Sequence, residues 1–380
     1  MSAALPQVAF AADGLSLRWP GGLAADFASL WLRDNRREDR DAHSGQRLID
    51  VMDLPAAPRI RSAVILAGAL RVEWEDDPVT ADFDLGWLAA MAPGAAHPRP
   101  ELARRCWLEG AALNASRDFA WDSLECLRFD ALARLEWMIR LLQDGVAFFS
   151  GVPCTADGIL EAMQWVGQVS ATNYGLVFDV RSVPKPENLA YSDLGLGLHT
   201  DNPYREPVPG FQALHALQTS SEGGDSVFAD GIALADHLRD TDPESFAVLT
   251  ATPVPFAYRS ADADLYAERP LIQLACDGSV TAVHYNSRSI APLRLAARDM
   301  QAFYAAYRRF AALLREPRFQ LRFRLRDGDL VMFDNQRILH GRTAFSSQRQ
   351  PRYLRGCYLS RDSVYSAAAL LRRQLREKSP

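Results

Sequence analysis

Hydrophobic and polar residues alternate in short runs over the first part of the chain, as they do in β-strands. Apolar runs at residues 8–10 and 15–19 flank Asp13-Gly14, a dipeptide that favours a tight hairpin turn. A further β-prone apolar run covers residues 62–74. Residues 1–92 are therefore predicted to form a small, mostly β domain, and the stretch 93–105, with its prolines and glycine, is predicted to be a linker.

Residues 106–380 are predicted to form a larger domain that begins with helices. Residues 129–143 carry apolar side chains at helical spacing, namely Leu132, Leu135, Met138 and Leu142. A second amphipathic helix is predicted to begin at Thr155 and to end near residue 169, and the apolar residues 146–149 between the two helices indicate a buried strand. Residues 170–197 show no regular pattern, and a loop of that length inside a compact domain usually has a function.

From His199 onward the pattern is typical of β-strands. Strands are predicted at residues 211–219, 226–229, 271–275, 280–286, 319–325, 330–333 and 352–359, and helices at 296–315 and 363–378. Many short strands supported by helices indicate a double-stranded β-helix, or jelly roll. The predicted fold class is mainly β with helices, a jelly-roll domain preceded by the small N-terminal β domain.

Composition narrows the functional classes. The 380 residues are 48% hydrophobic and 23% charged, which fits a globular enzyme, and the net charge of −5 without a basic tract argues against a nucleic-acid partner. No apolar run approaches the roughly 18 residues that a membrane span needs. Because the N-terminus lacks a charged leader and the five cysteines show no paired spacing, we expect a cytoplasmic protein with reduced, mostly buried thiols.

The candidate chemistry centres on His199-Thr200-Asp201 and His340. Residues i and i+2 of an extended segment point the same way, so His199 and Asp201 can reach one metal ion, and His340 can add a second imidazole from another strand. Two histidines and one carboxylate on one face of a metal suit non-haem Fe(II) that must also hold a co-substrate and O2. The simpler alternative is a capped turn with a surface histidine, although His199 alone among the seven histidines has an acid two places on.

An arginine and a serine suggest a second part of this site. Arg352 stands at the start of the last predicted strand, where its planar guanidinium can bind a carboxylate with two hydrogen bonds. Ser226 lies on a neighbouring predicted strand and can complete that carboxylate site. A metal triad beside a deep arginine is suited to 2-oxoglutarate; the alternative is that Arg352 pairs with an acid at the surface.

Four motifs together resemble a known family. They are His199-Thr-Asp201, the turn Gly223-Gly-Asp-Ser226, the run from Asp334 to Arg342 with His340, and Arg352-x-x-x-Gly356-Cys-Tyr358. With Trp31-Leu-Arg-Asp-Asn35 and Gly45-Gln-Arg47, the chain resembles the γ-butyrobetaine hydroxylase branch of the taurine dioxygenase superfamily over nearly its whole length. The resemblance implies an Fe(II)- and 2-oxoglutarate-dependent dioxygenase that uses O2 to hydroxylate a methylene, with Leu214 beside Arg352 and Ser226 in the co-substrate site.

The resemblance also implies an aromatic cage for a trimethylammonium group, formed here by Tyr174, Phe178, Tyr191 and Tyr358. A quaternary ammonium has no hydrogen to donate, so proteins recognise it with ring faces. Each of these residues alone would more often be an ordinary core aromatic.

Further matches concern the anionic end of the substrate. Asn188 and Asn286 match polar positions near a substrate carboxylate, and Arg288 would add a positive charge suited to a phosphonate, unless it forms a surface ion pair. Two substrates stay open: γ-butyrobetaine, and 2-(trimethylammonio)ethylphosphonate, the substrate of a related enzyme class.

One departure from the family concerns zinc. Relatives usually hold a structural zinc through cysteines just after the Trp-Leu-Arg-Asp-Asn motif, whereas residues 36–43 here contain no thiol, so we predict no zinc. The resemblance favours a homodimer. The alternative to an enzyme is a non-catalytic jelly roll that binds quaternary ammonium compounds.

Overall fold

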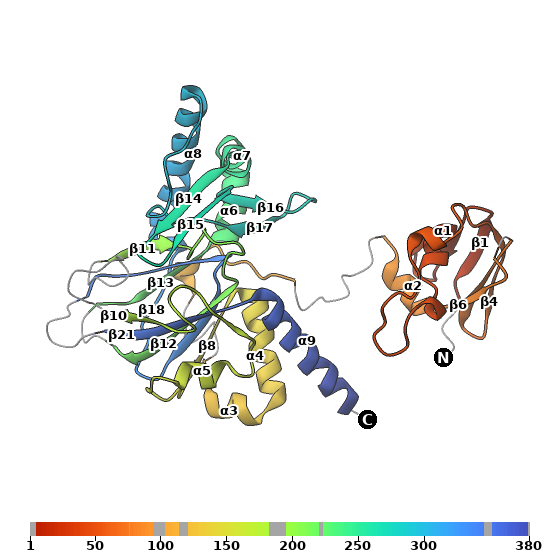
Figure 1. The fold of residues 1–380 in the computed structure, drawn as a ribbon, viewed down its shortest axis with the longest axis horizontal. Coiled ribbons are helices and arrows are strands. Elements are labelled where there is room, and N and C mark those ends of the chain that lie inside the picture. Colours follow the sequence, from red (N-terminus) through yellow and green to blue (C-terminus); the bar gives the residue numbers. More distant parts are fainter. Residues whose placement is uncertain are drawn as a thin grey trace. The chain divides into compact units, whose positions relative to one another are not determined.

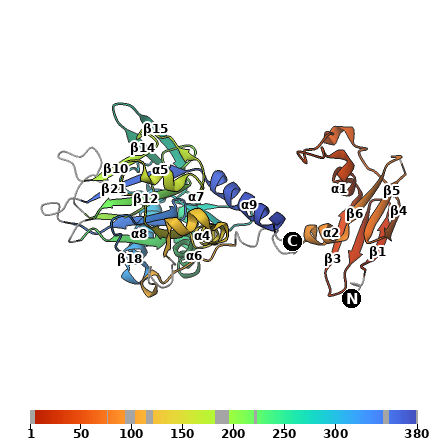
Figure 2. The ribbon, with the colours of Figure 1, turned by 90° about the horizontal axis from the view of Figure 1, so that it is seen from below.

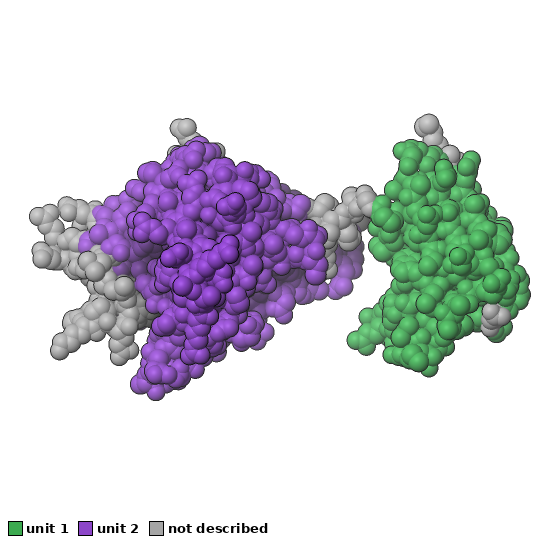
Figure 3. All heavy atoms as spheres, turned by 90° about the horizontal axis from the view of Figure 1, so that it is seen from above, with its two compact units in different colours: residues 1–100 green, residues 101–380 purple. Residues whose placement is uncertain are grey.

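The computed structural model describes residues 5–75, 77–93, 103–113, 121–181, 195–219, 223–345 and 352–378, and it divides the chain into two units, residues 1–100 and 101–380 (Figure 3). Unit 1 contains the elements β1 (Gln7–Ala11), β2 (Gly14–Arg18), β3 (Ala24–Ala28), α1 (Ser29–Asp34), β4 (Ile60–Leu66), β5 (Ala69–Trp74), β6 (Thr80–Asp84) and α2 (Leu85–Met91). Its strands form two antiparallel three-stranded sheets, β1-β2-β3 and β4-β5-β6. Leu17, Leu70 and Leu88 are fully buried in the core of this unit.

Two turns of unit 1 differ from the sequence prediction. The first hairpin turns at Ala12-Asp13, because Gly14 already pairs within the sheet, where a Cβ would come within 2.7 Å of the Phe27 carbonyl oxygen. The apolar run 62–74 is divided into β4 and β5 by a turn at Ala67 and Gly68, whose φ angles are 49° and 83°.

Unit 2 consists of two main sheets and seven helices among the described residues. Its helices are α3 (Leu124–Phe129), α4 (Ala131–Asp144), α5 (Gly158–Met163), α6 (Gly231–Thr241), α7 (Pro243–Ala251), α8 (Ala297–Arg315) and α9 (Arg361–Lys378). Its strands are β7 (Trp121–Ser123), β8 (Val146–Ser150), β9 (Val169–Ser170), β10 (Phe178–Arg181), β11 (Leu196–His199), β12 (Phe211–Gln218), β13 (Ser226–Asp230), β14 (Val254–Arg259), β15 (Asp264–Arg269), β16 (Ile272–Leu274), β17 (Val280–Val283), β18 (Leu321–Phe323), β19 (Leu330–Asp334), β20 (Ile338–Arg342) and β21 (Tyr353–Leu359).

The two main sheets pack face to face and confirm the predicted jelly roll. The larger sheet has the order β10-β21-β12-β19-β8-β7, with β9 on β21, and the smaller has the order β11-β20-β13-β18. One hydrophobic cluster joins Phe228 and Phe323 of the smaller sheet to Phe148 and Phe333 of the larger. Since successive side chains of a strand point to opposite faces, this cluster takes only every second residue of β19.

The other residues of the larger sheet contact a layer of helices on its outer face. Trp137 and Met138 of α4 belong to the same cluster as Met332 of β19 and Cys357 of β21. This double coverage explains why residues 330–333 form a continuous apolar run rather than an alternating one. The first half of α9 packs in this layer, and its C-terminal half extends beyond it (Figures 1 and 2).

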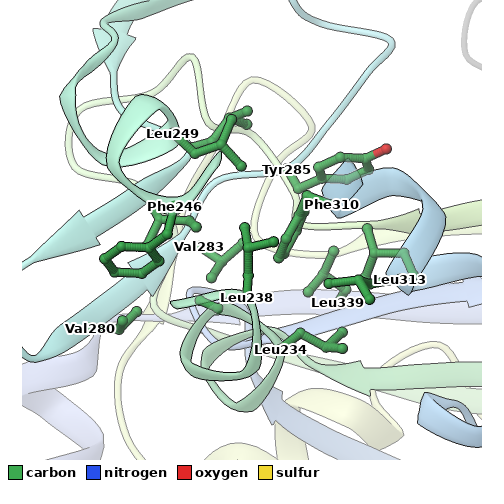
Figure 4. Packing of buried hydrophobic residues seen from close by; sticks show 14 of the residues in the cluster. Leu234, Leu238, Phe246, Leu249, Val280, Val283, Tyr285, Phe310, Leu313 and Leu339 are labelled. Atoms are coloured by element: carbon green, nitrogen blue, oxygen red, sulfur yellow. The ribbon is translucent and has the colours of Figure 1, made fainter. Parts of the chain in front are cut away.

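A third layer covers the smaller sheet, and two of its helices, α6 and α7, were not predicted from the sequence. Helices α6, α7 and α8 pack together with the hairpin β16–β17 around Leu238, Leu249 and Phe310 (Figure 4). Leu339 of β20 points into the same cluster. This layer therefore supports the strand that carries His340 from behind.

The first two helices of unit 2 also differ from the predicted ranges. Helix α4 begins after Asp130, whose Oδ1 accepts hydrogen bonds from the amides of Leu132 and Ala133, so Phe129 ends α3 instead. The helix predicted from Thr155 to near residue 169 is reduced to α5, which begins at Gly158, where a Cβ would meet the Pro153 carbonyl oxygen at 2.2 Å, and ends at Met163.

Two further sequence predictions concern thiols and membranes. Only Cys357 is buried, whereas Cys106, Cys126, Cys154 and Cys276 are exposed, so the prediction of mostly buried thiols is wrong; all five are free. None of the described helices combines the length and the apolar character that crossing a membrane requires.

Candidate active site

The two predicted metal-binding histidines are direct neighbours across two strands. His199 ends β11 and pairs in register with His340 of β20, and the centroids of their rings lie 4.3 Å apart. Asp201 follows the end of β11, with Oδ1 3.2 Å from His199 Nε2 and Oδ2 3.7 Å from His340 Nε2. Of the described residues, these three alone form a group of potential metal ligands, and their ligand atoms lie within 4.8 Å of one another.

Hydrogen bonds to two distant segments hold the backbone of His199-Thr200-Asp201. The Thr200 amide donates to the Tyr285 carbonyl oxygen at 2.7 Å, and the Tyr285 amide donates to Thr200 Oγ1 at 3.0 Å. On the other flank, the Asp201 amide donates to Asn335 Oδ1 at 2.7 Å, and Asn335 Nδ2 donates back to the Asp201 carbonyl oxygen at 3.1 Å. These hydrogen bonds fix the backbone position from which the Asp201 side chain extends.

The protonation states suit a divalent metal. Burial, and then the proximity of His199, lowers the pKa of His340 to about 3, so its imidazole is neutral near pH 7. Burial alone would raise the pKa of Asp201, but the His340 and His199 rings and the Tyr358 hydroxyl hold it well below its usual range. His199 Nδ1 lies 2.9 Å from the Gly197 carbonyl oxygen; a proton on Nδ1 leaves the Nε2 lone pair facing Asp201. The donor set therefore fits a metal ion.

Arg352 is a buried cation beside this group. Its exposed fraction is 6%, and burial, together with the charge of Arg342, lowers its pKa to about 9, so it stays protonated near pH 7. Among the described residues, no carboxylate pairs with Arg352, and its guanidinium carbon lies 6.0 Å from the centroid of the Phe345 ring. A buried cation without an anionic partner is costly, so this position is prepared for an anion.

One cavity, partly open to solvent, connects these groups. Its walls include all three potential metal ligands and also Arg352, Ser226 and Leu214. A ligand that contacts the metal group can therefore also reach Arg352.

A row of aromatic rings forms another wall of the cavity. Phe178 of β10 stacks on Tyr358 of β21 with centroids 5.0 Å apart, and Tyr174 lies 6.4 Å from Phe178. Behind Tyr174, the ring of Tyr258 continues the row at 6.0 Å and itself stacks on Tyr204 at 5.2 Å. The structure thus brings three of the four predicted cage residues to one cavity, whereas Tyr191 lies outside the described residues.

Comparison with known proteins identifies the family. The family model of taurine catabolism dioxygenase TauD and TfdA matches residues 110–358. A γ-butyrobetaine dioxygenase of Pseudomonas sp. (strain AK-1) is 34% identical over 97% of this chain and 96% of its own length. The human γ-butyrobetaine dioxygenase is 26% identical over 97% of this chain and 98% of its own. A trimethyllysine dioxygenase of Meyerozyma guilliermondii is 26% identical over 94% of each chain.

The chain belongs to the TauD/TfdA family of dioxygenases. This result confirms the family resemblance and the expectation of an enzyme, a dioxygenase that uses Fe(II) and 2-oxoglutarate. The alternative of a non-catalytic binding module is not supported.

Of the residues predicted to lie near the substrate anion, Arg288 lines the cavity and Asn286 does not. Asn286 is buried and is not part of the cavity wall; its Nδ2 donates to the Thr200 carbonyl oxygen at 3.1 Å, and its Oδ1 accepts from the Arg288 amide at 3.3 Å. Arg288 does line the cavity, at an exposed position, and forms no ion pair within the described part of the chain. Asn188 lies outside the described residues.

Sequence reasoning missed several polar groups around the metal ligands. Asn202 lines the cavity immediately after Asp201, with φ of 54°, and accepts a hydrogen bond from the Tyr204 hydroxyl at 2.6 Å, while its buried Nδ2 lacks a partner in the described structure. Tyr358 donates its hydroxyl hydrogen to Asp201 Oδ2 at 2.7 Å. Asparagine adopts a positive φ more readily than most residues, so the residue type at position 202 was the one local signal in the sequence for this conformation. No local signal in the sequence indicated the contact between Tyr358 and Asp201.

Proposed function

We propose that this dioxygenase hydroxylates a methylene of a small trimethylammonium acid, either γ-butyrobetaine, which gives carnitine, or 2-(trimethylammonio)ethylphosphonate. The observation that carries this proposal is a single cavity that combines a His-Asp-His metal group, a buried arginine and a row of aromatic rings. The names of the relatives agree with it, since γ-butyrobetaine and trimethyllysine both carry a trimethylammonium group.

In this proposal, His199, Asp201 and His340 hold the iron. Bound iron and 2-oxoglutarate supply the oxidising power with O2, and the co-substrate leaves as succinate and CO2. Arg352 binds the distal carboxylate of 2-oxoglutarate, with Ser226 and Leu214 beside it, because no acid of the described chain competes for the guanidinium.

The aromatic wall binds the trimethylammonium head. Tyr174, Phe178 and Tyr358 present their rings to the same cavity, and each well-placed ring contributes about 0.5–2 kcal/mol to the binding of such a cation. By the family resemblance, Tyr191 completes the cage. Holding the head at one end decides which methylene faces the metal, so positioning rather than proton transfer selects the carbon that is hydroxylated.

The anionic end of the substrate lies toward Arg288, with Asn188 and Asn286 assigned by the resemblance alone. Arg288 lies at the cavity wall, where partial desolvation of its guanidinium lowers its pKa by more than the nearby Asp201 carboxylate raises it. A guanidinium there suits a doubly charged phosphonate at least as well as a carboxylate.

Succinate release with a panel of trimethylammonium acids tests the proposal. Stimulation by γ-butyrobetaine or the ethylphosphonate, with none by the matching primary amines, would support it, and equal rates with and without every onium compound would contradict it. Arg288→Ala should then reduce turnover of the phosphonate more than that of the carboxylate. The exposed Arg294, later in the same loop, provides the control variant Arg294→Ala.

We also propose that the enzyme is a cytoplasmic homodimer, as the family resemblance implies. Light scattering coupled to size-exclusion chromatography should give twice the 42.2 kDa chain mass. A mass of one chain at all concentrations would refute the dimer.

A further inference from the structure

The ring and the hydroxyl of Tyr358 contact two different parts of the site. Its ring lies in the aromatic wall, stacked on Phe178 at an interplanar angle of 28°. Its hydroxyl donates to Oδ2 of Asp201 at 2.7 Å, and both residues line the cavity. The side chain is buried, so water does not compete for this hydrogen bond.

As a result, the two oxygens of the Asp201 carboxylate have different contacts. Its Oδ2 accepts the Tyr358 hydrogen bond and lies 3.7 Å from His340 Nε2, whereas Oδ1 lies closer to its histidine, 3.2 Å from His199 Nε2. The backbone clamp from Asn335 holds the main chain of Asp201 but does not contact the carboxylate. Among the described residues, Tyr358 is the one hydroxyl that hydrogen-bonds this carboxylate, and it bonds Oδ2 alone.

We propose that Tyr358 is a positioning residue for the metal ligand Asp201: its hydroxyl holds Oδ2 and leaves Oδ1 to bind the iron. Binding through one oxygen keeps coordination positions open for the co-substrate and O2. The same residue thereby joins the wall that binds the substrate cation to a ligand of the metal. This inference rests on the proposed function, because it requires iron at the His-Asp-His group.

The variant Tyr358→Phe separates the two roles, since it removes the hydroxyl and keeps the ring. We measure the affinity for Mn(II), which does not react with O2, in the presence of 2-oxoglutarate, and the affinity of the loaded protein for tetramethylammonium. Mn(II) should bind about 10- to 100-fold more weakly, as is usual when the partner of a metal ligand is removed. Tetramethylammonium binding should stay within about twofold, because the ring face is unchanged.

The matched control is Tyr353→Phe. Tyr353 lies on the same strand and donates to Asp179 Oδ1 at 3.0 Å, so the control removes an equivalent hydroxyl–carboxylate bond away from the metal ligands. Weakened Mn(II) binding in Tyr358→Phe alone, at an unchanged melting temperature, supports the proposal. Wild-type Mn(II) affinity in Tyr358→Phe, or equal weakening in both variants with lowered melting temperatures, overturns it. Failure of the wild-type protein itself to bind Mn(II) would overturn the proposed function as well.

Discussion

At the scale of single residues, the site contains a few polar groups, such as Asn202 Nδ2, that have no partner among the described residues. Arg352 is a related case, because it is buried and protonated while no carboxylate of the described chain neutralises it. An unpaired buried charge destabilises the folded state, and it strengthens the binding of an anion that enters the same space.

Replacing Arg352 by methionine should therefore have opposite effects on stability and on binding. The melting temperature of the protein without ligands should stay the same or rise, whereas the dissociation constant for 2-oxoglutarate should increase on the order of 100-fold, about 2.7 kcal/mol. Differential scanning fluorimetry and a 2-oxoglutarate titration measure the two. A large loss of stability with unchanged co-substrate binding would show that Arg352 has a structural role only.

Asn335 gives a second prediction at this scale. It is fully buried, and its side chain bonds the amide and carbonyl of Asp201 and the carbonyl of Pro209, so Asn335→Ala leaves three backbone groups without this partner. We expect a loss of roughly 2–4 kcal/mol in the free energy of unfolding and weaker metal binding. Urea unfolding and Mn(II) titration provide the readouts. Gln336→Ala is the control, since Gln336 bonds the Val208 carbonyl oxygen instead; an equal effect on metal binding in both variants would contradict a specific clamp.

The sequence indicated the potential metal ligands but not the residues that hold their backbone in place. The i, i+2 spacing of His199 and Asp201 is a local property of an extended chain, so it could be interpreted from the sequence. The clamp by Asn335 and Tyr285 joins segments far apart along the chain, and nothing in the local pattern indicates the pairing. Asn286 was matched by motif alone, and the structure places its amide against Thr200 rather than in the cavity wall.

At the scale of elements, a buried ion pair connects the strands of the site to the helices. Arg337, between β19 and β20, donates to Asp230 Oδ2 at 2.7 Å and to the carbonyl oxygens of Gln143 and Arg105. Asp230 also caps the N-terminus of α6 through its other oxygen. This node fixes the start of β20, the strand on which His340 lies.

Breaking this node should destabilise the fold more than most substitutions. Arg337→Met leaves Asp230 buried with an uncompensated charge, and we expect a loss of about 3–5 kcal/mol in the free energy of unfolding. The double variant Arg337→Met/Asp230→Asn should recover part of that loss. Chemical unfolding of both proteins tests this, and an effect below about 1 kcal/mol for the single variant would be inconsistent with a structural node.

Helices α6 and α7 show why some elements were not predicted. Each is short, and α7 has buried residues at only two positions, so neither displays a long apolar stripe. Their positions depend on packing against α8 and β20, which only the folded chain reveals. By contrast, α8 with nineteen residues was predicted to within one residue of its ends.

At the scale of the whole molecule, buried neutral histidines make stability depend on pH. Burial, followed by the charge of Arg355, lowers the pKa of His215 to about 4, and burial lowers that of His284 to about 3. Because the unfolded chain binds protons near the ordinary histidine pKa, this stability is complete above about pH 6.5 and is lost as the pH falls toward 4. His215 alone should lower the free energy of unfolding by roughly 3 kcal/mol as the pH falls over that range.

Urea unfolding at about pH 7.5 and about pH 5 measures this effect. The variant His215→Leu should show a smaller difference between the two conditions than the wild-type protein, while His43→Gln, at an exposed position, should show the same difference. An unchanged pH dependence in His215→Leu would exclude His215 as a source.

The most direct test of the account is anaerobic titration with Fe(II) in the presence of 2-oxoglutarate, followed by visible absorption. The wild-type protein should develop a weak charge-transfer band that saturates at one iron per chain. His340→Ala should show no band, and Arg352→Met should show it only at much higher 2-oxoglutarate concentrations. A wild-type-like band in His340→Ala would contradict the assignment of this cavity as the iron and co-substrate site.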